Sequence, residues 1–251
     1  LFLYLAYPAP HTPWLPAKQF RGQSGAGMYG EFTMMVDHMI GRVLKALKKA
    51  NMADDTVVIF SSDNGPVWYE SDVERFDHDS SGGLRGMKAD AWECGHRMPF
   101  IVRWPGNVTA GTVNDRLICF TDLLATFGEL VGKELSEDAG PDSISFYKTL
   151  TGQSEPDRPT LVIKSSSGAM TARQGPWKLI TQLGSGGFSK PSRIKPTRGG
   201  PVGQLYNLDD DIGETNNLYD QKPEIVAKIS AELKRIQDSG ASRTLGHQNR
   251  Q

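Results

Sequence analysis

The chain has 251 residues, 38% hydrophobic and 23% charged, which is enough to bury the core of one large domain or two smaller ones. Its 28 basic and 29 acidic residues give a formal net charge of -1, so the charge balance gives no support to a nucleic-acid partner. No apolar stretch approaches the ~20 residues needed to span a bilayer. Residue 1 is Leu rather than Met, and an apolar run begins at once. Because natural termini are usually polar and loosely held, we expect further sequence upstream.

The first half of the chain alternates predicted strands and helices. LFLYLAY (1–7) predicts a strand, and apolar residues spaced by three and four over 27–47 predict an amphipathic helix. Two further strands are predicted at VVIF (57–60) and PFIVRW (99–104), and another helix begins at Thr121. Because these strands are almost entirely apolar, they favour an α/β fold with a mainly parallel sheet sandwiched by helices.

The second half of the chain has a different pattern. Past about Asp157, short strand-like runs separated by turns predict a small antiparallel sheet: TLVIKSS, GAMTARQ, WKLITQL and GQLYNL. A closing helix is predicted after Pro223, since proline is accepted in a first turn. Residues 184–203 are rich in Gly, Ser and Pro and hold four basic residues but no acidic one. This segment is predicted to be a mobile loop, either simply solvated or facing an anionic substrate.

The strand-like run VVIF stops at the most informative polar sequence, Ser61-Ser62-Asp63-Asn64-Gly65. Asp63 and Asn64 offer a carboxylate and an amide oxygen, which suit Ca²⁺ or Mg²⁺ better than Zn²⁺. Gly65 permits the sharp turn that lets both side chains converge, and α/β sheets bind ligands at the ends of their strands. Taken alone, the same residues are also typical of an ordinary turn.

Two cationic candidates accompany this pair. His11 lies in the proline-rich loop after the first predicted strand, and Lys88 follows Asp63 by 25 residues in a glycine-punctuated segment. Taken separately, an isolated histidine is usually structural or exposed, and Lys88 has Asp90 and Glu93 nearby as ion-pair partners. Taken together, the order of His11, the Asp63–Asn64 pair and Lys88 along the chain favours a site that holds an anion beside a hard cation.

Three stretches resemble the sulfatase family, arylsulfatase-like members of the alkaline phosphatase superfamily: LYLAYPAPHTP, TVVIFSSDNG and GLRGMKADAWECGHRMPFIVRWPG. GPWKLI and LYNLDDDIGETNNL resemble the C-terminal subdomain of that family. The resemblance implies that residues 1–157 are the C-terminal part of the catalytic domain and that 158–251 form an α+β subdomain. One departure is Cys94, which stands where the family commonly has glycine.

The resemblance also implies a role for each candidate. Asp63 and Asn64 would hold Ca²⁺, with Mg²⁺ as an alternative, while Lys88 and His11 would bind the sulfate and take part in catalysis. The implied activity is hydrolysis of sulfate esters, as in sulfated carbohydrates, by a formylglycine nucleophile. The resemblance further implies export to the periplasm or the cell exterior.

The nucleophile of the family is a cysteine or serine in a C/S-x-P/A-x-R context. Neither Cys94 nor Cys119 stands in that context, and we predict that the chain contains no such nucleophile. The nucleophile and the first paired aspartates of the metal site are therefore expected upstream of Leu1. It follows that this chain alone should be catalytically inactive.

Two other functional classes stay open. A phosphodiester or phosphonate hydrolase of the same superfamily would handle a similar anion, but its two-zinc relatives have histidine where Asn64 stands. A degenerate, binding-only sulfatase relative is the alternative that is not an enzyme. Neither the natural substrate nor the oligomeric state follows from the sequence.

Overall fold

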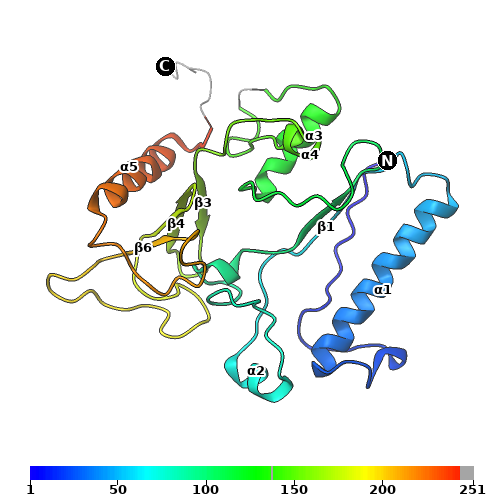
Figure 1. Cartoon of the computed structure of the whole chain (residues 1–251), viewed down its shortest axis with the longest axis horizontal. Helices are drawn as coiled ribbons and strands as arrows, with labels where there is room; N and C mark the ends of the chain where they lie inside the picture. The colour runs from blue at the N-terminus through cyan, green and yellow to red at the C-terminus, as the bar shows by residue number, and fades with distance from the viewer. Residues whose placement is uncertain (137, 244–251) are drawn as a thin grey trace.

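Two antiparallel sheets organise the chain in the computed structural model, which describes residues 1–136 and 138–243. β1 (Val58–Ser61) and β2 (Phe100–Arg103) form the first sheet. The second contains four strands in sequence order: β3 (Leu161–Lys164), β4 (Met170–Gln174), β5 (Trp177–Ile180) and β6 (Gln204–Asn207). The four-stranded sheet lies toward one end of the molecule and the long helix α1 (Gly27–Lys49) at the other, with β1 and β2 between them (Figure 1).

The two long helices form where the apolar spacing predicts them. These are α1 and α5 (Pro223–Ser239), which has Pro223 in its first turn. The helix expected from Thr121 also forms, as a 3-10 turn followed by α3. The remaining short helices are η1 (Lys18–Phe20), α2 (Glu70–Phe76), η2 (Glu93–Gly95), η3 (Phe120–Asp122), α3 (Leu123–Leu130) and α4 (Tyr147–Leu150). None of the helices in the described ranges is both long and apolar enough to cross a membrane.

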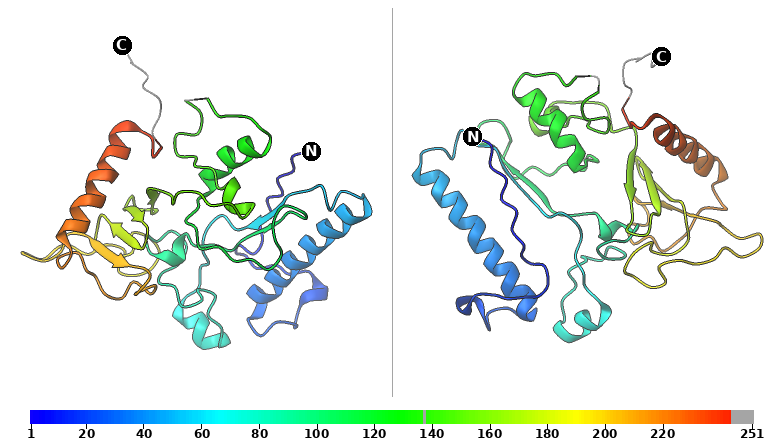
Figure 2. Two further views of the ribbon diagram at one scale, coloured as in Figure 1. Left: turned by 45° about the horizontal axis from the view of Figure 1, so that its top comes forward. Right: turned by 180° about the vertical axis from the view of Figure 1, so that it is seen from behind.

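The strand predicted for residues 1–7 does not form. These residues have no regular secondary structure, and the side chains of Leu1 and Phe2 are 101% and 76% exposed. A strand needs a neighbour for its backbone hydrogen bonds, and no strand of the described chain pairs with this segment. Figures 1 and 2 show it as an extended trace between β1 and α1.

The predicted mainly parallel sheet is also not found. In the described residues every strand pair is antiparallel, although the mixture of helices and sheets is as expected. The physical reason lies in the β1–β2 connection (62–99), which returns the chain to the strand end that it left, so that Ser61 stands opposite Phe100. A parallel pair would need a crossover to the opposite end.

The four-stranded sheet is covered on both faces. Against one face, α5 packs Val226, Ile229 and Leu233 onto Ala172, Leu179 and Leu205. Against the other, Ala91 and Trp92 of the β1–β2 connection pack with a second buried set: Ala169, Ile180, Tyr206 and Leu208. Since neighbouring residues of a strand point to opposite faces, β5 directs Leu179 to the helix and Ile180 to the connection. The sheet thus joins the closing helix to the segment that follows Lys88.

Replacing Ile229 with alanine tests this packing. Ile229 is 1% exposed at the centre of the contact between α5 and the sheet, so the Ile229→Ala variant should lose about 2–5 kcal/mol of unfolding free energy. Urea unfolding followed by circular dichroism measures the change. In the control variant Lys228→Ala, which alters an exposed neighbour, the change should stay within about 0.5 kcal/mol. Equal losses in the two variants would contradict the packing described.

Candidate functional site

Three of the four predicted site residues lie on the β1–β2 connection. Its two ends are joined at the strand pair, where the Ser61 hydroxyl donates to the Pro99 carbonyl at 2.7 Å. Further along, the Lys88 N–H donates to the Pro66 carbonyl at 2.8 Å. Asp63 and Asn64 therefore lie on a segment whose backbone is hydrogen-bonded directly to that of Lys88. Asp63 is exposed, and Asn64 and Lys88 are half-buried.

Gly65 allows these two backbones to touch. Its N–H donates to the Gly95 carbonyl at 3.2 Å. A Cβ atom on residue 65 would lie 1.6 Å from the Cys94 carbonyl oxygen, so any side chain would drive the segments apart. Glycine is thus required here by close packing rather than by an unusual φ, and it fixes Asp63 and Asn64 relative to the Lys88 segment.

His11 reaches this neighbourhood through an aromatic cluster. Trp14, three residues further on, lies 6.3 Å from Trp68 and 5.6 Å from Tyr29 between ring centroids, and Tyr29 lies 4.6 Å from Trp68. Trp68 belongs to the β1–β2 connection, four residues after Asn64. The exposed imidazole of His11 bonds to the Thr12 carbonyl at 2.6 Å. The cluster brings the His11 loop against the connection without a direct bond to the other candidates.

Lys88 has no ion-pair partner among the described residues. The structural alternative, a salt bridge to Asp90 or Glu93, is therefore wrong. Asp90 is 3% exposed and accepts the backbone N–H groups of Met87 at 2.9 Å and Ser189 at 3.1 Å. The Lys88 ammonium is consequently available to an external anion.

Glu93 is held instead by a buried lysine that sequence reasoning missed. The Lys178 ammonium on β5 lies 3.0 Å from one Glu93 oxygen and 2.9 Å from a Glu214 oxygen, and all three side chains are at most 3% exposed. The second Glu214 oxygen accepts the Glu93 N–H at 2.6 Å. The only sequence signal was a lysine within the apolar run WKLI. This ion cluster fastens the segment after Lys88 to the four-stranded sheet.

The cluster shifts the pKa values of its members in different directions. Burial opposes ionisation of Glu93, but the charge of Lys178 and the hydrogen bond from His96 hold the pKa of its carboxyl well below the usual range. Burial raises the pKa of Glu214, assisted by the charge of Glu93. Burial and the charge of Lys178 lower the pKa of His96. At neutral pH, Glu93 is thus the ionised partner of Lys178 beside a neutral imidazole.

Asp63 and Asn64 suit a hard cation by their donor chemistry. Both present oxygen, which Ca²⁺ and Mg²⁺ prefer. Two side chains supply fewer than the six or more ligands that Ca²⁺ takes, and the described residues contain no group of three or more His, Cys, Asp or Glu arranged to hold a metal. The pair fits part of a calcium shell.

Comparison with known proteins assigns the chain to a family. A family model described as Sulfatase matches residues 1–133. The chain belongs to the sulfatase family. It is 33% identical over 240 residues to the N-acetylgalactosamine-6-O-sulfatase of Bacteroides thetaiotaomicron, covering 94% of this chain and 47% of that protein. It is 35% identical over 158 residues to human N-acetylgalactosamine-6-sulfatase, covering 63% of this chain and 30% of the relative.

A solved structure supports the same family assignment. It comes from work on the metabolism of multiple glycosaminoglycans by Bacteroides thetaiotaomicron and superimposes with a TM-score of 0.80 at 32% identity. The match covers 91% of this chain and 48% of that one. The chain therefore spans less than half the length of these relatives.

Cys94 has the properties of a structural thiol in this member of the sulfatase family. It is 1% exposed, and its carbonyl packs against Gly65. Burial raises the pKa of the Cys94 thiol to about 11. A thiol that stays protonated at neutral pH is a poor nucleophile, so the departure from glycine introduces no competing reactive group beside Lys88.

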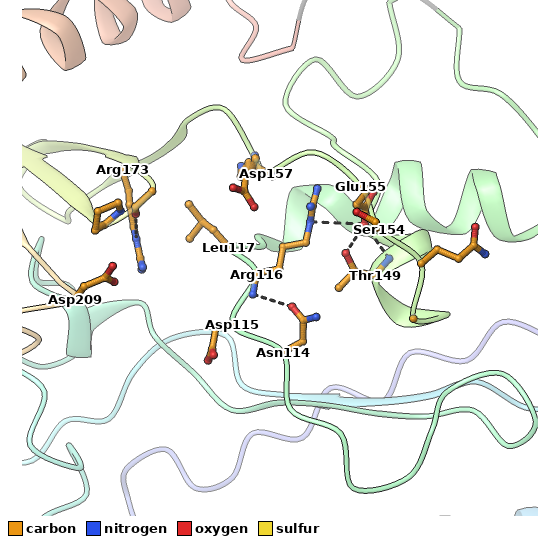
Figure 3. Close-up of a pocket in the computed structure, with 15 residues that line it drawn as sticks. Asn114, Asp115, Arg116, Leu117, Thr149, Ser154, Glu155, Asp157, Arg173 and Asp209 are labelled. Carbon is orange, nitrogen blue, oxygen red and sulfur yellow. Dashed lines mark hydrogen bonds and ion pairs between the residues drawn. The ribbon is translucent and has the colours of Figure 1, made fainter.

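One serine also matches the nucleophile pattern of the family, but it lies away from the predicted site residues. Ser154-Glu155-Pro156-Asp157-Arg158 fits C/S-x-P/A-x-R. Ser154 is exposed at a hollow of about 660 Å³, and neither His11, Asp63, Asn64 nor Lys88 lines this hollow (Figure 3). Arg158 is buried in an ion pair with Asp122. The match therefore lies away from the predicted site, and its arginine has a structural partner.

Replacing Lys178 with methionine tests how much the buried ion cluster contributes to the free energy of unfolding. The substitution leaves Glu93 and Glu214 buried without their cation, so unfolding free energy should fall by about 3–5 kcal/mol. Denaturant unfolding measures the change, with Lys164→Met, at an exposed lysine of β3, as the matched control. Adding Glu93→Gln and Glu214→Gln to Lys178→Met should recover much of the loss. A triple variant as unstable as the single one would contradict the electrostatic explanation.

His96 should make stability depend on pH. Because its pKa is lowered on folding from the ordinary 6.5, the unfolded chain takes up the proton first as the pH falls. Its contribution is complete above about pH 6.5 and declines below that value, by at most about 1.4 kcal/mol per pH unit. The raised pKa of Glu214 acts in the opposite direction, since its contribution to stability is lost as the pH rises above the ordinary 4.5. Unfolding free energies at pH 7.5 and 5.5 should therefore differ less in His96→Gln, and an unchanged difference would exclude His96 as the cause.

Proposed function

We propose that this chain forms part of a sulfuric ester hydrolase that acts on sulfated carbohydrates. The observation that carries the proposal is the unpaired ammonium of Lys88 on the same closed connection as the oxygen ligands Asp63 and Asn64. A free positive charge beside hard oxygen donors suits a compact anion held next to a hard cation. The names of the relatives support a 6-sulfated N-acetylgalactosamine as the substrate unit.

Each candidate residue takes a distinct role in this proposal. Asp63 and Asn64 would hold Ca²⁺, or Mg²⁺, which when bound supplies positive charge that stabilises anionic oxygens. Lys88, a compact point charge, binds a sulfate oxygen. His11 hydrogen-bonds the bridging oxygen and donates a proton to the leaving alcohol. The formylglycine implied by the family has no counterpart at Cys94, Cys119 or Ser154, so we propose that another segment supplies it.

The two rival classes give different expectations. A phosphodiester or phosphonate hydrolase would favour phosphate esters over sulfate esters, and the amide of Asn64 fits its zinc chemistry less well than an imidazole would. A binding-only relative would bind sulfate without any partner segment restoring turnover. Binding and turnover measurements therefore separate the three classes.

Binding of N-acetylgalactosamine 6-sulfate to the 251-residue chain tests the proposal. In the presence of Ca²⁺ the ester should bind, and Lys88→Ala should weaken binding by about tenfold or more, since a hydrogen bond to a charged group is lost. Isothermal titration calorimetry gives the affinities. The control variant Ser154→Ala should bind like the unchanged chain, and the chain alone should not turn over a generic aryl sulfate.

Three results would contradict parts of this proposal. Full turnover by the 251-residue chain would refute the need for another segment. Equal affinity in Lys88→Ala would remove the sulfate site, and tighter binding of the corresponding phosphate ester would favour the phosphate-handling class.

A further inference from the structure

We propose that residues 184–203, the basic loop, bind anionic groups of a sulfated glycan chain beyond the sulfate that Lys88 holds. This inference rests on the proposed function, because it extends the same site to a longer substrate. The four cations that would make the contact are Lys190, Arg193, Lys195 and Arg198.

The base of the basic loop is fastened to the turn that follows Lys88. The Ala91 N–H donates to the Ser185 carbonyl at 2.7 Å, and the Ser189 N–H donates to an Asp90 carboxylate oxygen at 3.1 Å. Gly187 is pressed so closely on Ala89 that a Cβ atom would lie 2.4 Å from its carbonyl carbon. The loop therefore starts within a few residues of Lys88, although it is about a hundred residues away in sequence.

The same part of the loop is also ordered by its own hydrogen bonds. The Gly186 N–H donates to the Ser192 carbonyl at 2.8 Å, and the Ile194 N–H donates to the Leu183 carbonyl at 3.1 Å. These bonds close a turn around Lys190 and lead directly into the remaining basic residues. The basic side chains thus follow a hydrogen-bonded turn that lies beside the Lys88 segment.

The positive charge of the basic loop is not neutralised within the described chain. All four cationic side chains are exposed, none forms an ion pair with a described residue, and the loop holds no acidic residue. The hollow of Figure 3 differs, because each of its three arginines is near a carboxylate: Arg116 with Glu155, Arg158 with Asp122 and Arg173 with Glu93. Of these two surfaces, only the basic loop offers uncompensated charge to a polyanion.

A sulfated glycan fits this surface better than a nucleic acid does. The loop adjoins Lys88, whose proposed ligand is the sulfate of a sugar, and a glycan with repeated sulfates would place further anions along the same chain. The overall charge of -1 gives no general attraction to nucleic acid. A single-stranded DNA is therefore a suitable competitor in the test.

The experiment compares two matched fourfold variants of the full chain. One changes Lys190, Arg193, Lys195 and Arg198 to glutamine. The control variant changes four exposed cations of α1 to glutamine: Arg42, Lys45, Lys48 and Lys49. Helix α1 lies at the end of the molecule opposite to the basic loop (Figure 1). The probe is a 6-O-sulfated chondroitin hexasaccharide, with unsulfated chondroitin hexasaccharide as the ligand control. Calorimetric titration at two salt concentrations gives Kd and its salt dependence.

The loop variant should raise Kd for the sulfated hexasaccharide about tenfold, since four exposed charge contacts each contribute modestly, and should reduce the salt dependence. The α1 variant should bind like the unchanged chain. Unchanged Kd in the loop variant, an equal loss in the α1 variant, or equally tight loop-dependent binding of single-stranded DNA would overturn the inference. Lys88→Ala titrated with the monosaccharide sulfate tests the proposed function separately, so either idea can fail while the other stands.

Discussion

The position of the candidate site depends on one buried ammonium, that of Lys178 on β5. It lies within 3.0 Å of carboxylate oxygens on Glu93 and Glu214, in a place where water reaches none of the three side chains appreciably. Removing one member of such a cluster leaves an uncompensated charge in a low-dielectric environment, which is far more costly than losing an exposed pair. The three residues come from three separate segments, so the cluster also specifies how those segments meet.

From this cluster the constraint extends to both sides of Lys88. On the preceding side, Arg85 lies over the Trp92 ring at 3.8 Å and donates to the Glu214 carbonyl. On the following side, Ala91 and Trp92 pack on the sheet face opposite α5. The segment with Lys88 is thereby fixed by residues of the second half of the chain, while Asp63 and Asn64 are placed against it by the close approach at Gly65. The C-terminal sheet is thus a platform for the site.

The sequence reveals local features of this arrangement and misses those set by distant contacts. Helices α1 and α5 follow directly from apolar spacing, and the short strands from alternation and turns. Lys164 and Lys178 look alike in sequence, each in a short strand-like run, yet Lys164 is exposed and Lys178 is 2% exposed. The difference arises because Glu93 and Glu214 approach only one of them. The direction of β2 relative to β1 also could not be read from local sequence, because it is set by the path of the connection between them. Ser154 shows further that a sequence motif does not reveal which residues surround it in the fold.

The same contacts explain why the ammonium of Lys88 stays free although carboxylates lie close by. Glu93 is engaged by Lys178 and by His96, Arg97 and Arg173 at 3.4–3.5 Å. Both carboxylate oxygens of Asp90 accept hydrogen bonds from backbone N–H groups, and one of these donors, Ser189, belongs to the basic loop. Asp90 and Glu93, the two acidic residues that follow Lys88, therefore both have structural partners, and their negative charge is satisfied internally. The outward-facing groups that stay without a partner among the described residues include Lys88 and the four cations of the adjoining loop, together with the exposed carboxylate of Asp63, which suits a cation. An anion that bridges a bound cation and Lys88 would complete this charge distribution without displacing any contact that holds the fold together.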